Sequence, residues 1–270
     1  MRRYSKNRTI YTVLIGLCLL GFWIFENFYT PASYSQSERS SGETSFPSDY
    51  LPSSTTDDIV HHSYFSLSYN ERYEQAEWVA YVLKKEHLTS NDRKRPYFIE
   101  DPYVSTKSAD WRNYKGSGYD RGHLVPAGDR RFSEQAYNET FYTSNISPQD
   151  RDFNAGLWNR LEVQTRNWSK RYKTLYVYTG GVLTNGLDEI GSEDVAVPEY
   201  FYKIIAKEDR GQLAVLGFLM RASEQTQPLE NFVVPIDRIE NLTGIDFFYQ
   251  LNTDEQVRLE EGTQLKNWKF

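Results

Sequence analysis

Cysteine is almost absent from this chain of 270 residues, whose single cysteine, Cys18, lies inside an apolar N-terminal run. An intramolecular disulfide and a cysteine-ligated metal site are therefore excluded. Positive charge is also scarce, because 31 lysines and arginines face 37 aspartates and glutamates, which gives a net charge of -6. That balance argues against a generally basic nucleic-acid-binding surface, so any contact with nucleic acid must use a local cluster of cations.

Long apolar runs are limited to residues 10–25, which follow a basic segment without acids. The run is short of the roughly 20 residues that cross a bilayer, but residues 27–29 can extend it into the interface. A small-x-small cleavage site is missing, and a mitochondrial presequence would be amphipathic and richer in arginine and serine. We therefore expect an uncleaved signal anchor, a transmembrane helix at residues 10–28. Residues 1–9 form its cytoplasmic flank, and the rest lies on the periplasmic or extracellular side.

Residues 29–60 are rich in serine, threonine, proline and glutamate. Such a composition buries too little apolar area to offset the entropy of ordering, so we expect a flexible stalk. Residues 61–270 are then left for one domain. The whole chain has 21 tyrosines and 16% aromatic residues, so a sizeable core is available. The pair His61-His62 at the domain's start is interpreted as surface or packing histidines rather than as a metal site.

The first part of this domain shows both kinds of hydrophobic period. Residues 64–69 alternate and predict a strand. Residues 70–86 place Ala76, Val79, Ala80 and Leu83 at helical spacing and predict a helix, which His87 would end.

The remaining elements are short and mixed. A helical turn is expected at residues 133–136, a helix at 154–170, and a helix at 237–244 closed by Gly244. Strands are expected at residues 119–124, 141–146, 174–179, 201–206, 213–219 and 232–236. The chain shows no internal repeat, and this order favours an α+β fold.

Two motifs carry the chemistry. The first, Asp120-Arg121-Gly122-His123, places a base beside a fixed cation, and Asn154 follows His123 by 31 positions (154 minus 123). Glu162 and Arg166 then add a carboxylate and a second cation. Histidine can deprotonate water near neutral pH, Mg²⁺ takes few protein oxygen ligands plus phosphate, and arginine offsets phosphate charge. Together these groups indicate a phosphodiesterase.

The same residues, with Ser144-Asn145-Ile146-Ser147-Pro148-Gln149 between the two motifs and Trp158, Leu161 and Glu162 after Asn154, carry a family resemblance. From about residue 64 to 248 the chain resembles the DNA/RNA non-specific endonucleases, the family of the Serratia nuclease and endonuclease G. The resemblance implies the ββα-metal (His-Me finger) fold, in which two short strands and a helix hold a divalent ion within a central mixed or antiparallel sheet flanked by helices.

Each site residue has a functional and a plainer interpretation. His123 is the candidate general base or a core histidine. Asn154 is the candidate metal ligand or a helix N-cap. In a regular helix Glu162 lies about 12 Å along the axis and about 80° around it from Asn154, so it reaches the ion through water or merely pairs with Arg166. Arg121 stabilises the transition state or pairs with Asp120.

The resemblance further implies that Arg166 lies near the phosphate and that Asn145 supports the fold or the site. Basic tracts at residues 93–96 and 107–112 are candidates for the substrate groove. Asp150 and Asp152, just before Asn154, would repel phosphate unless they face solvent or a counter-ion.

We therefore expect a Mg²⁺-dependent endonuclease, with Mn²⁺ or another divalent cation as an alternative, that cuts DNA and RNA with little sequence preference. The expected partners are DNA and RNA substrates and the membrane, with a homodimer left open. Two alternatives remain at this point: a catalytically silent module that binds nucleic acid or an inhibitor, and hydrolysis of another phosphodiester.

Overall fold

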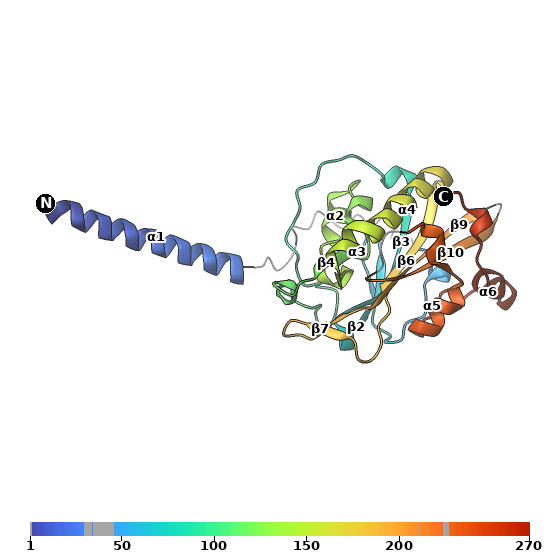
Figure 1. The fold of residues 1–270 in the computed structure, drawn as a ribbon. Coiled ribbons are helices and arrows are strands. Elements are labelled where there is room, and N and C mark those ends of the chain that lie inside the picture. Colours follow the sequence, from blue (N-terminus) through green and yellow to red (C-terminus); the bar gives the residue numbers. More distant parts are fainter. Residues whose placement is uncertain (1, 30–33, 35–45, 210, 224–226) are drawn as a thin grey trace. The chain divides into compact units, whose positions relative to one another are not determined.

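The computed structural model describes residues 2–29, 34, 46–209, 211–223 and 227–270, which belong to two compact units, residues 1–34 and 35–270. The first unit contains one long helix, α1 (Arg2–Phe28), drawn in blue in Figure 1. Its stretch Asn7–Phe25 is exposed, has a mean hydropathy of 1.8, and is long and apolar enough to cross a membrane. The expected apolar helix at residues 10–28 is therefore present.

The second unit is built on a seven-stranded sheet with the order β1-β2-β3-β6-β9-β10-β11. In that order the strands are Ile59–His61, Ser66–Asn70, Gln75–Lys84, Thr174–Gly181, Tyr200–Asp209, Gln212–Arg221 and Val233–Val234. All neighbouring strands are antiparallel. Two-stranded ribbons are formed by β4 (Asp120–His123) with β5 (Ile146–Gln149) and by β7 (Asp188–Ile190) with β8 (Val195–Val197).

Helices complete the second unit: α2 (Glu134–Glu139), α3 (Arg151–Phe153), α4 (Asn159–Tyr172), α5 (Ile236–Thr243) and α6 (Thr253–Glu260). The class is thus α+β, with an antiparallel sheet and flanking helices as expected. The helix predicted at residues 237–244 is confirmed, and Gly244 ends α5 in the left-handed conformation with φ 73°.

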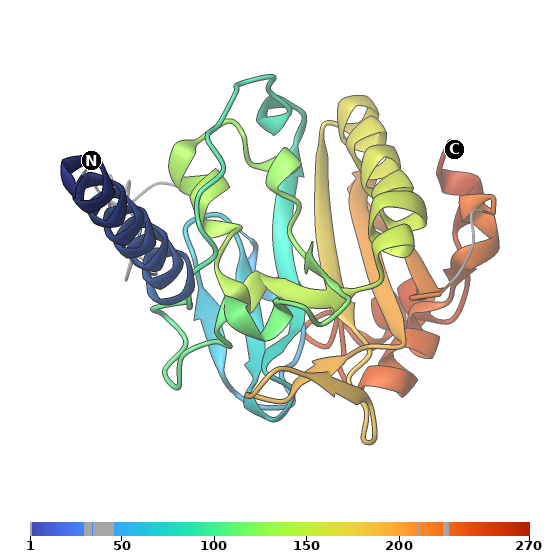
Figure 2. The same ribbon diagram turned by 60° about the vertical axis from the view of Figure 1, so that its left-hand side comes forward.

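The sheet separates two hydrophobic cores. Val79 and Tyr81 of β3 join one core, together with Leu161 and Trp168 of α4. Their neighbours on β3, Trp78 and Ala80, join the other core, which includes residues of α5 and α6. Successive side chains of a strand point to opposite faces, so α4 covers one face and α5 and α6 cover the other. Figure 2 shows α4 lying along the sheet.

The prediction of a helix at residues 70–86 was wrong. Its apolar part is β3 (Gln75–Lys84), which lies between β2 and β6 and is buried on both faces. A strand covered on both sides is apolar almost continuously, so the helical spacing of Ala76, Val79, Ala80 and Leu83 was incidental. His87 consequently ends no α-helix; it is the last residue of a 3-10 turn, Lys85–His87, and its ring stacks on Phe132 with 4.1 Å between centroids.

The strand predicted at residues 141–146 was placed too early. Residues Thr143–Asn145 form a 3-10 turn, and β5 begins at Ile146 and includes Pro148. Proline is tolerated there because β5 pairs on one side only, with β4.

The structure differs from the stalk expected at residues 29–60 over the second part of that segment, residues 46–60. Phe46, Tyr50 and Leu51 pack against the core under α5 and α6, and the indole N–H of Trp78 donates to the Ser53 carbonyl at 2.8 Å. Residues 59–61 form β1 of the sheet. These aromatic and aliphatic side chains supply the apolar area that an average over the whole segment conceals. Residues 30–33 and 35–45 lie outside the described residues.

In the histidine pair His61-His62, His62 is a packing histidine, which is one of the two roles expected. Its ring is buried, and Nε2 lies 2.8 Å from the Asp101 carboxylate.

Candidate active site

The strand ribbon β4–β5 positions the first motif. Asp120 lies opposite Gln149, and His123 lies opposite Ile146. A Cβ added to Gly122 would lie 2.3 Å from the Gln149 side chain, so glycine is required for this close approach.

The second motif follows β5 directly. Asp150 caps the helix, because its carboxylate accepts hydrogen bonds from the backbone N–H groups of Asp152 (2.8 Å) and Phe153 (3.0 Å). Asp150 thus stabilises the helix start, and both Asp150 and Asp152 are exposed to solvent. Asn154 is therefore not the N-cap; it opens a π-helical turn, Asn154–Trp158, between α3 and α4.

This π-helical turn also corrects the predicted spacing. Hydrogen bonds from i to i+5 replace the regular i to i+4 pattern there, so the helix between Asn154 and Glu162 is not a regular α-helix. The predicted 12 Å and 80° between the two residues therefore do not apply to this segment.

Asp120 connects the two motifs. The side-chain amide of Asn154 donates to Asp120 Oδ2 at 3.2 Å, and Arg151 Nε lies 3.5 Å from Asp120 Oδ1. Arg121, the expected alternative partner of Asp120, instead lies with its guanidinium carbon 4.7 Å from the Phe98 ring centroid.

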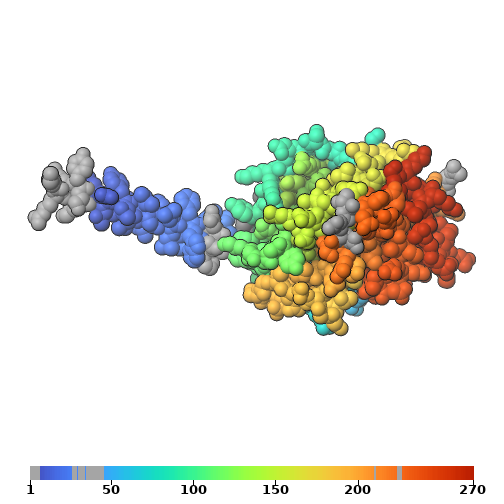
Figure 3. Space-filling view, in the orientation of Figure 1, coloured from blue at the N-terminus to red at the C-terminus, as the bar shows by residue number. Residues whose placement is uncertain are grey.

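A cavity of about 600 Å³ brings the motif residues together. Its lining consists of Arg95, Tyr114, Tyr119, Asp120, Arg121, His123, Ala127, Tyr137, Phe141, Arg151 and Asn154. His123, Arg121 and Asn154 thus line the same cavity. Three arginines face one aspartate in this lining, so the cavity is locally basic although the chain carries a net charge of -6. In Figure 3 the green segment that leads into β4 and the yellow-green surface of α3 and α4 meet on one face of this unit.

The cavity keeps His123 neutral. Burial, followed by the charges of Arg95 and Arg121, lowers the pKa of His123 from 6.5 to about 3. The rings of Phe98 and Phe141 lie 5.7 Å and 5.0 Å from the imidazole. At neutral pH the imidazole is therefore uncharged and able to accept a proton.

Arg95 is a residue that the sequence identified only as part of the tract 93–96. Its guanidinium lies over the rings of Phe98 and Phe141, at 5.3 Å and 5.7 Å, beside His123. A basic tract ahead of the motif gave a signal, but the sequence alone did not distinguish Arg95 from its neighbours.

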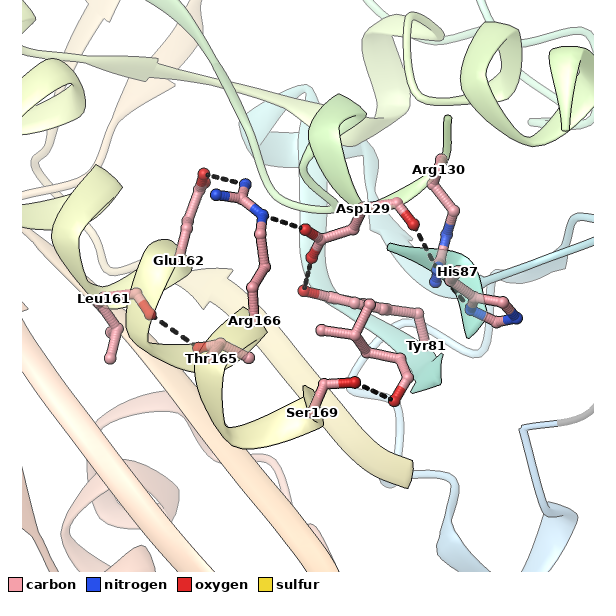
Figure 4. Close-up of polar contacts among 10 residues, drawn as sticks. Tyr81, His87, Asp129, Arg130, Leu161, Glu162, Thr165, Arg166 and Ser169 are labelled. Atoms are coloured by element: carbon pink, nitrogen blue, oxygen red, sulfur yellow. Dashed lines mark hydrogen bonds and ion pairs between the residues drawn. The ribbon is translucent and has the colours of Figure 1, made fainter. Parts of the chain in front are cut away.

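Glu162 and Arg166 are not among the residues that line the cavity. They form a separate chain of contacts, shown in Figure 4, in which Arg166 Nε lies 2.6 Å from Asp129 and Nη2 lies 3.1 Å from Glu162. Tyr81 donates to the second oxygen of Asp129 at 3.2 Å. The i,i+4 pair of Glu162 and Arg166 is therefore present, and Asp129 was missed by the sequence analysis.

A buried lysine completes this group. Lys203 of β9 donates to the Thr179 hydroxyl at 2.7 Å, and its ammonium lies 4.8 Å from the Trp158 ring centroid. Burial raises the pKa of Glu162 to about 7, against the lowering effect of Lys203 and Arg166. A lone lysine in the apolar run of residues 201–206 was the signal that could have identified it.

Asn145 supports the backbone beside the site. Its side chain accepts from the Val125 N–H at 2.8 Å and donates to the carbonyls of Val125 (3.1 Å) and Thr140 (2.9 Å). Asn145 thus fixes the loop that leaves His123, which is the structural one of its two expected roles.

Comparison with known proteins agrees with this arrangement. A family model described as DNA/RNA non-specific endonuclease matches residues 43–254, and the chain belongs to that family. It is 34% identical over 210 residues to the mitochondrial nuclease EXOG of Xenopus laevis, and the match covers 72% of this chain and 59% of that protein. It is 35% identical over 198 residues to the mitochondrial endonuclease G of Homo sapiens, covering 68% of this chain and 67% of that protein.

The chain therefore spans about three-fifths of the length of the EXOG relative. A solved structure described as the EndoG/EndoGI complex, on the mechanism of EndoG inhibition, is also similar. Its TM-score is 0.68 at 33% sequence identity, and the match covers 74% of this chain and 89% of that chain.

Proposed function

We propose that this protein is an endonuclease that hydrolyses phosphodiester bonds of DNA and RNA with little sequence preference, with Mg²⁺ or a similar divalent cation such as Mn²⁺. The observation that carries the proposal is that His123 and Asn154, 31 positions apart (154 minus 123), line one basic cavity. Membership of the endonuclease family and the similarity to named nucleases support the same activity.

His123 acts as the general base. Its neutral imidazole accepts a proton from water as the water oxygen attacks phosphorus and the bond to the leaving oxygen breaks. Burial and the nearby arginines keep the imidazole uncharged at neutral pH, so no proton has to be removed before the reaction.

Asn154 is the residue that would hold the divalent ion. Its amide N–H₂ donates to Asp120, which orients the side chain and leaves its carbonyl oxygen as the ligand atom. A neutral oxygen beside a carboxylate fits a hard cation that keeps most of its coordination positions for water and phosphate. When bound, such an ion supplies Lewis-acid stabilisation of the phosphate and the leaving oxygen.

The charged side chains around these two residues stabilise the substrate. Arg121 stabilises the charge that develops on phosphate, and Arg95, on the same lining, adds a second guanidinium. Glu162, which lies outside the cavity lining, would reach the ion through water. Arg166 forms an ion pair with Glu162 and packs beside Gly128. A Cβ added to Gly128 would lie 3.1 Å from Nη2 of Arg166.

We also propose that α1 anchors the protein in a membrane, with residues 1–9 on the cytoplasmic side and residues 35–270 on the extracytoplasmic side. The support is the exposed apolar stretch Asn7–Phe25 and the basic segment before it. That orientation separates a nuclease from the chromosome of its own cell. A reporter that works only in the cytoplasm is expected to be inactive when it is fused after Phe270. Activity of this fusion would overturn the orientation.

The full chain in detergent tests the activity. It is expected to nick supercoiled plasmid and cut RNA with Mg²⁺ or Mn²⁺, and EDTA is expected to stop both reactions. His123→Ala should slow cutting roughly 10²- to 10⁴-fold, which is the usual contribution of a general base, and free imidazole should restore part of the rate.

The matched control is His61→Ala, the same change at an exposed histidine outside the cavity lining, which should cut like the wild type. A His123→Ala protein that cuts at the wild-type rate removes the base assignment. A wild-type protein that binds plasmid without chelator-sensitive cutting identifies a binding module instead.

A further inference from the structure

Three carboxylates meet on the face of the sheet opposite to α4. Asp237 and Glu240 belong to α5, and Glu260 is the last residue of α6. One oxygen of each carboxylate lies within 4.8 Å of the others. Figure 1 shows the two helices as neighbours, and none of the three residues lines the cavity of His123.

Local structure does not favour this gathering of negative charge. Asp237 and Glu240 are three positions apart on one helix, a like-charge spacing that is destabilising. Glu260 lies at the C-terminal end of α6, where the helix dipole disfavours an anion.

Burial adds to the cost at Glu260. The residue is 8% exposed, and its Oε1 is buried without a hydrogen-bond partner in the part of the chain that the structure describes. A carboxylate that is buried and unpaired is strongly unfavourable unless a cation or a proton neutralises it. One oxygen of Glu260 lies within 4.8 Å of an oxygen of each of the other two carboxylates, so a single cation placed among them would neutralise all three.

The surroundings supply more negative charge. Burial, together with the charges of Asp246 and Asp237, raises the pKa of Glu240 to about 7. Burial, followed by the charges of Glu240, Asp246 and Asp237, raises the pKa of Glu260 to about 7. Glu240 accepts one hydrogen bond, from the Phe247 N–H at 2.9 Å. Among the described residues, none of the three carboxylates takes part in a salt bridge.

We propose that Asp237, Glu240 and Glu260 bind a hard divalent cation, with Ca²⁺ as the best match, which ties α6 to α5. Ca²⁺ takes oxygen ligands at about 2.3–2.6 Å, so two ligands of one ion lie at most about 5.2 Å apart. The observed limit of 4.8 Å falls inside that range. Three protein carboxylates suit Ca²⁺ better than Mg²⁺, which keeps several waters and uses one or two carboxylates.

Thermal unfolding of the full chain in detergent tests this site. The background is Asn154→Ala, which removes the proposed ligand of the active site, so the result does not depend on the proposed nuclease activity. After treatment with EDTA, Ca²⁺ at a hundredfold excess over its Kd should raise the Tm by about 5–10 °C, and Mg²⁺ at the same concentration should raise it less.

Glu260→Gln in this background should abolish most of the Ca²⁺-dependent rise. Without Ca²⁺ the same variant should melt at or above the temperature of its parent, because it loses a repelled, buried charge. The matched control is Glu261→Gln, the adjacent exposed glutamate, which should keep the full rise.

Asp237→Asn serves as a second variant should Glu260→Gln fail to fold, and it too should lose most of the rise. The proposal is overturned if Ca²⁺ leaves the parent's Tm unchanged. It is overturned equally if the folded variant that is tested keeps the parent's Ca²⁺ response.

Discussion

Gly122 offers a sharp test of how the ribbon β4–β5 positions His123. In Gly122→Ala the new Cβ would lie 2.3 Å from Cδ and Oε1 of Gln149 and 2.5 Å from its Cγ. Carbon atoms in contact are normally about 3.5–4.0 Å apart, so one side must move by more than about 1 Å. Gln149 is fully buried and has little room to move.

The expected cost follows from overpacking, which is about 1–3 kcal/mol in a well-packed core. For a domain of this size that corresponds to a loss of roughly 2–12 °C in Tm. The rate of cutting should also fall, by up to about a hundredfold, even at temperatures where the variant stays folded. The reason is that His123 is the next residue, and a displacement of about 1 Å in a catalytic group can cost about a hundredfold in rate.

A second substitution makes the reasoning refutable. Gln149→Ala removes the three atoms that the new Cβ meets, and it also removes a side-chain amide whose N and O are buried without hydrogen-bond partners among the described residues. The double variant should therefore recover most of the lost Tm and rate, with a coupling energy of at least about 1 kcal/mol. Gly262→Ala, where an added Cβ meets nothing within 4 Å, is the control. Additive losses in the double variant would show that the contact with Gln149 is not the cause.

Two other predictions concern stability. The pKa of Glu162 is raised to about 7, so the stability that its proton provides is complete below the unfolded value of 4.5 and is lost as pH rises through about 7. Wild type should accordingly lose Tm relative to Glu162→Gln between pH 5 and pH 7.5, and a difference that is constant with pH contradicts the assigned shift. Trp78→Ala should destabilise the protein by about 3–5 kcal/mol in urea unfolding, because it opens a cavity in the core against which Tyr50 and Leu51 pack and removes the hydrogen bond to Ser53. A loss below about 1 kcal/mol would mean that residues 46–58 do not depend on this anchor.

Of the site residues predicted from the sequence, His123, Arg121 and Asn154 line the cavity, whereas Glu162 and Arg166 do not. His123 and Asn154 could be paired because their residue types suit phosphodiester chemistry and because their motifs, in this order, resemble those of one family. The hydrogen bond of Asp120 to Asn154 could be placed only by the fold, since it requires β4 to lie beside the π-helical turn that Asn154 opens. Lys203 and Asp129 were missed for the same reason, because burial and charge partners depend on contacts between distant strands and helices.

Hydrophobic periodicity predicted the wrong secondary structure where both faces of an element are covered. β3 is apolar on both sides, so a helical stripe could be found in it, and the flanking strands decided its conformation. The prediction of a stalk failed for a different reason. The average composition of the segment is polar, but Phe46, Tyr50 and Leu51 attach its second part to the core.

The π-helical turn Asn154–Trp158 makes the candidate site sensitive to chain length. A π-helical turn closes over one residue more than an α-helical turn, so the rotation of Glu162 and Arg166 about the helix axis relative to Asn154 differs from that in a regular helix. Deletion or insertion of one residue within the turn would change that rotation although no site residue had been substituted. A single-codon change inside the second motif would thus be enough to alter how Asn154 and the pair of Glu162 and Arg166 are oriented relative to each other.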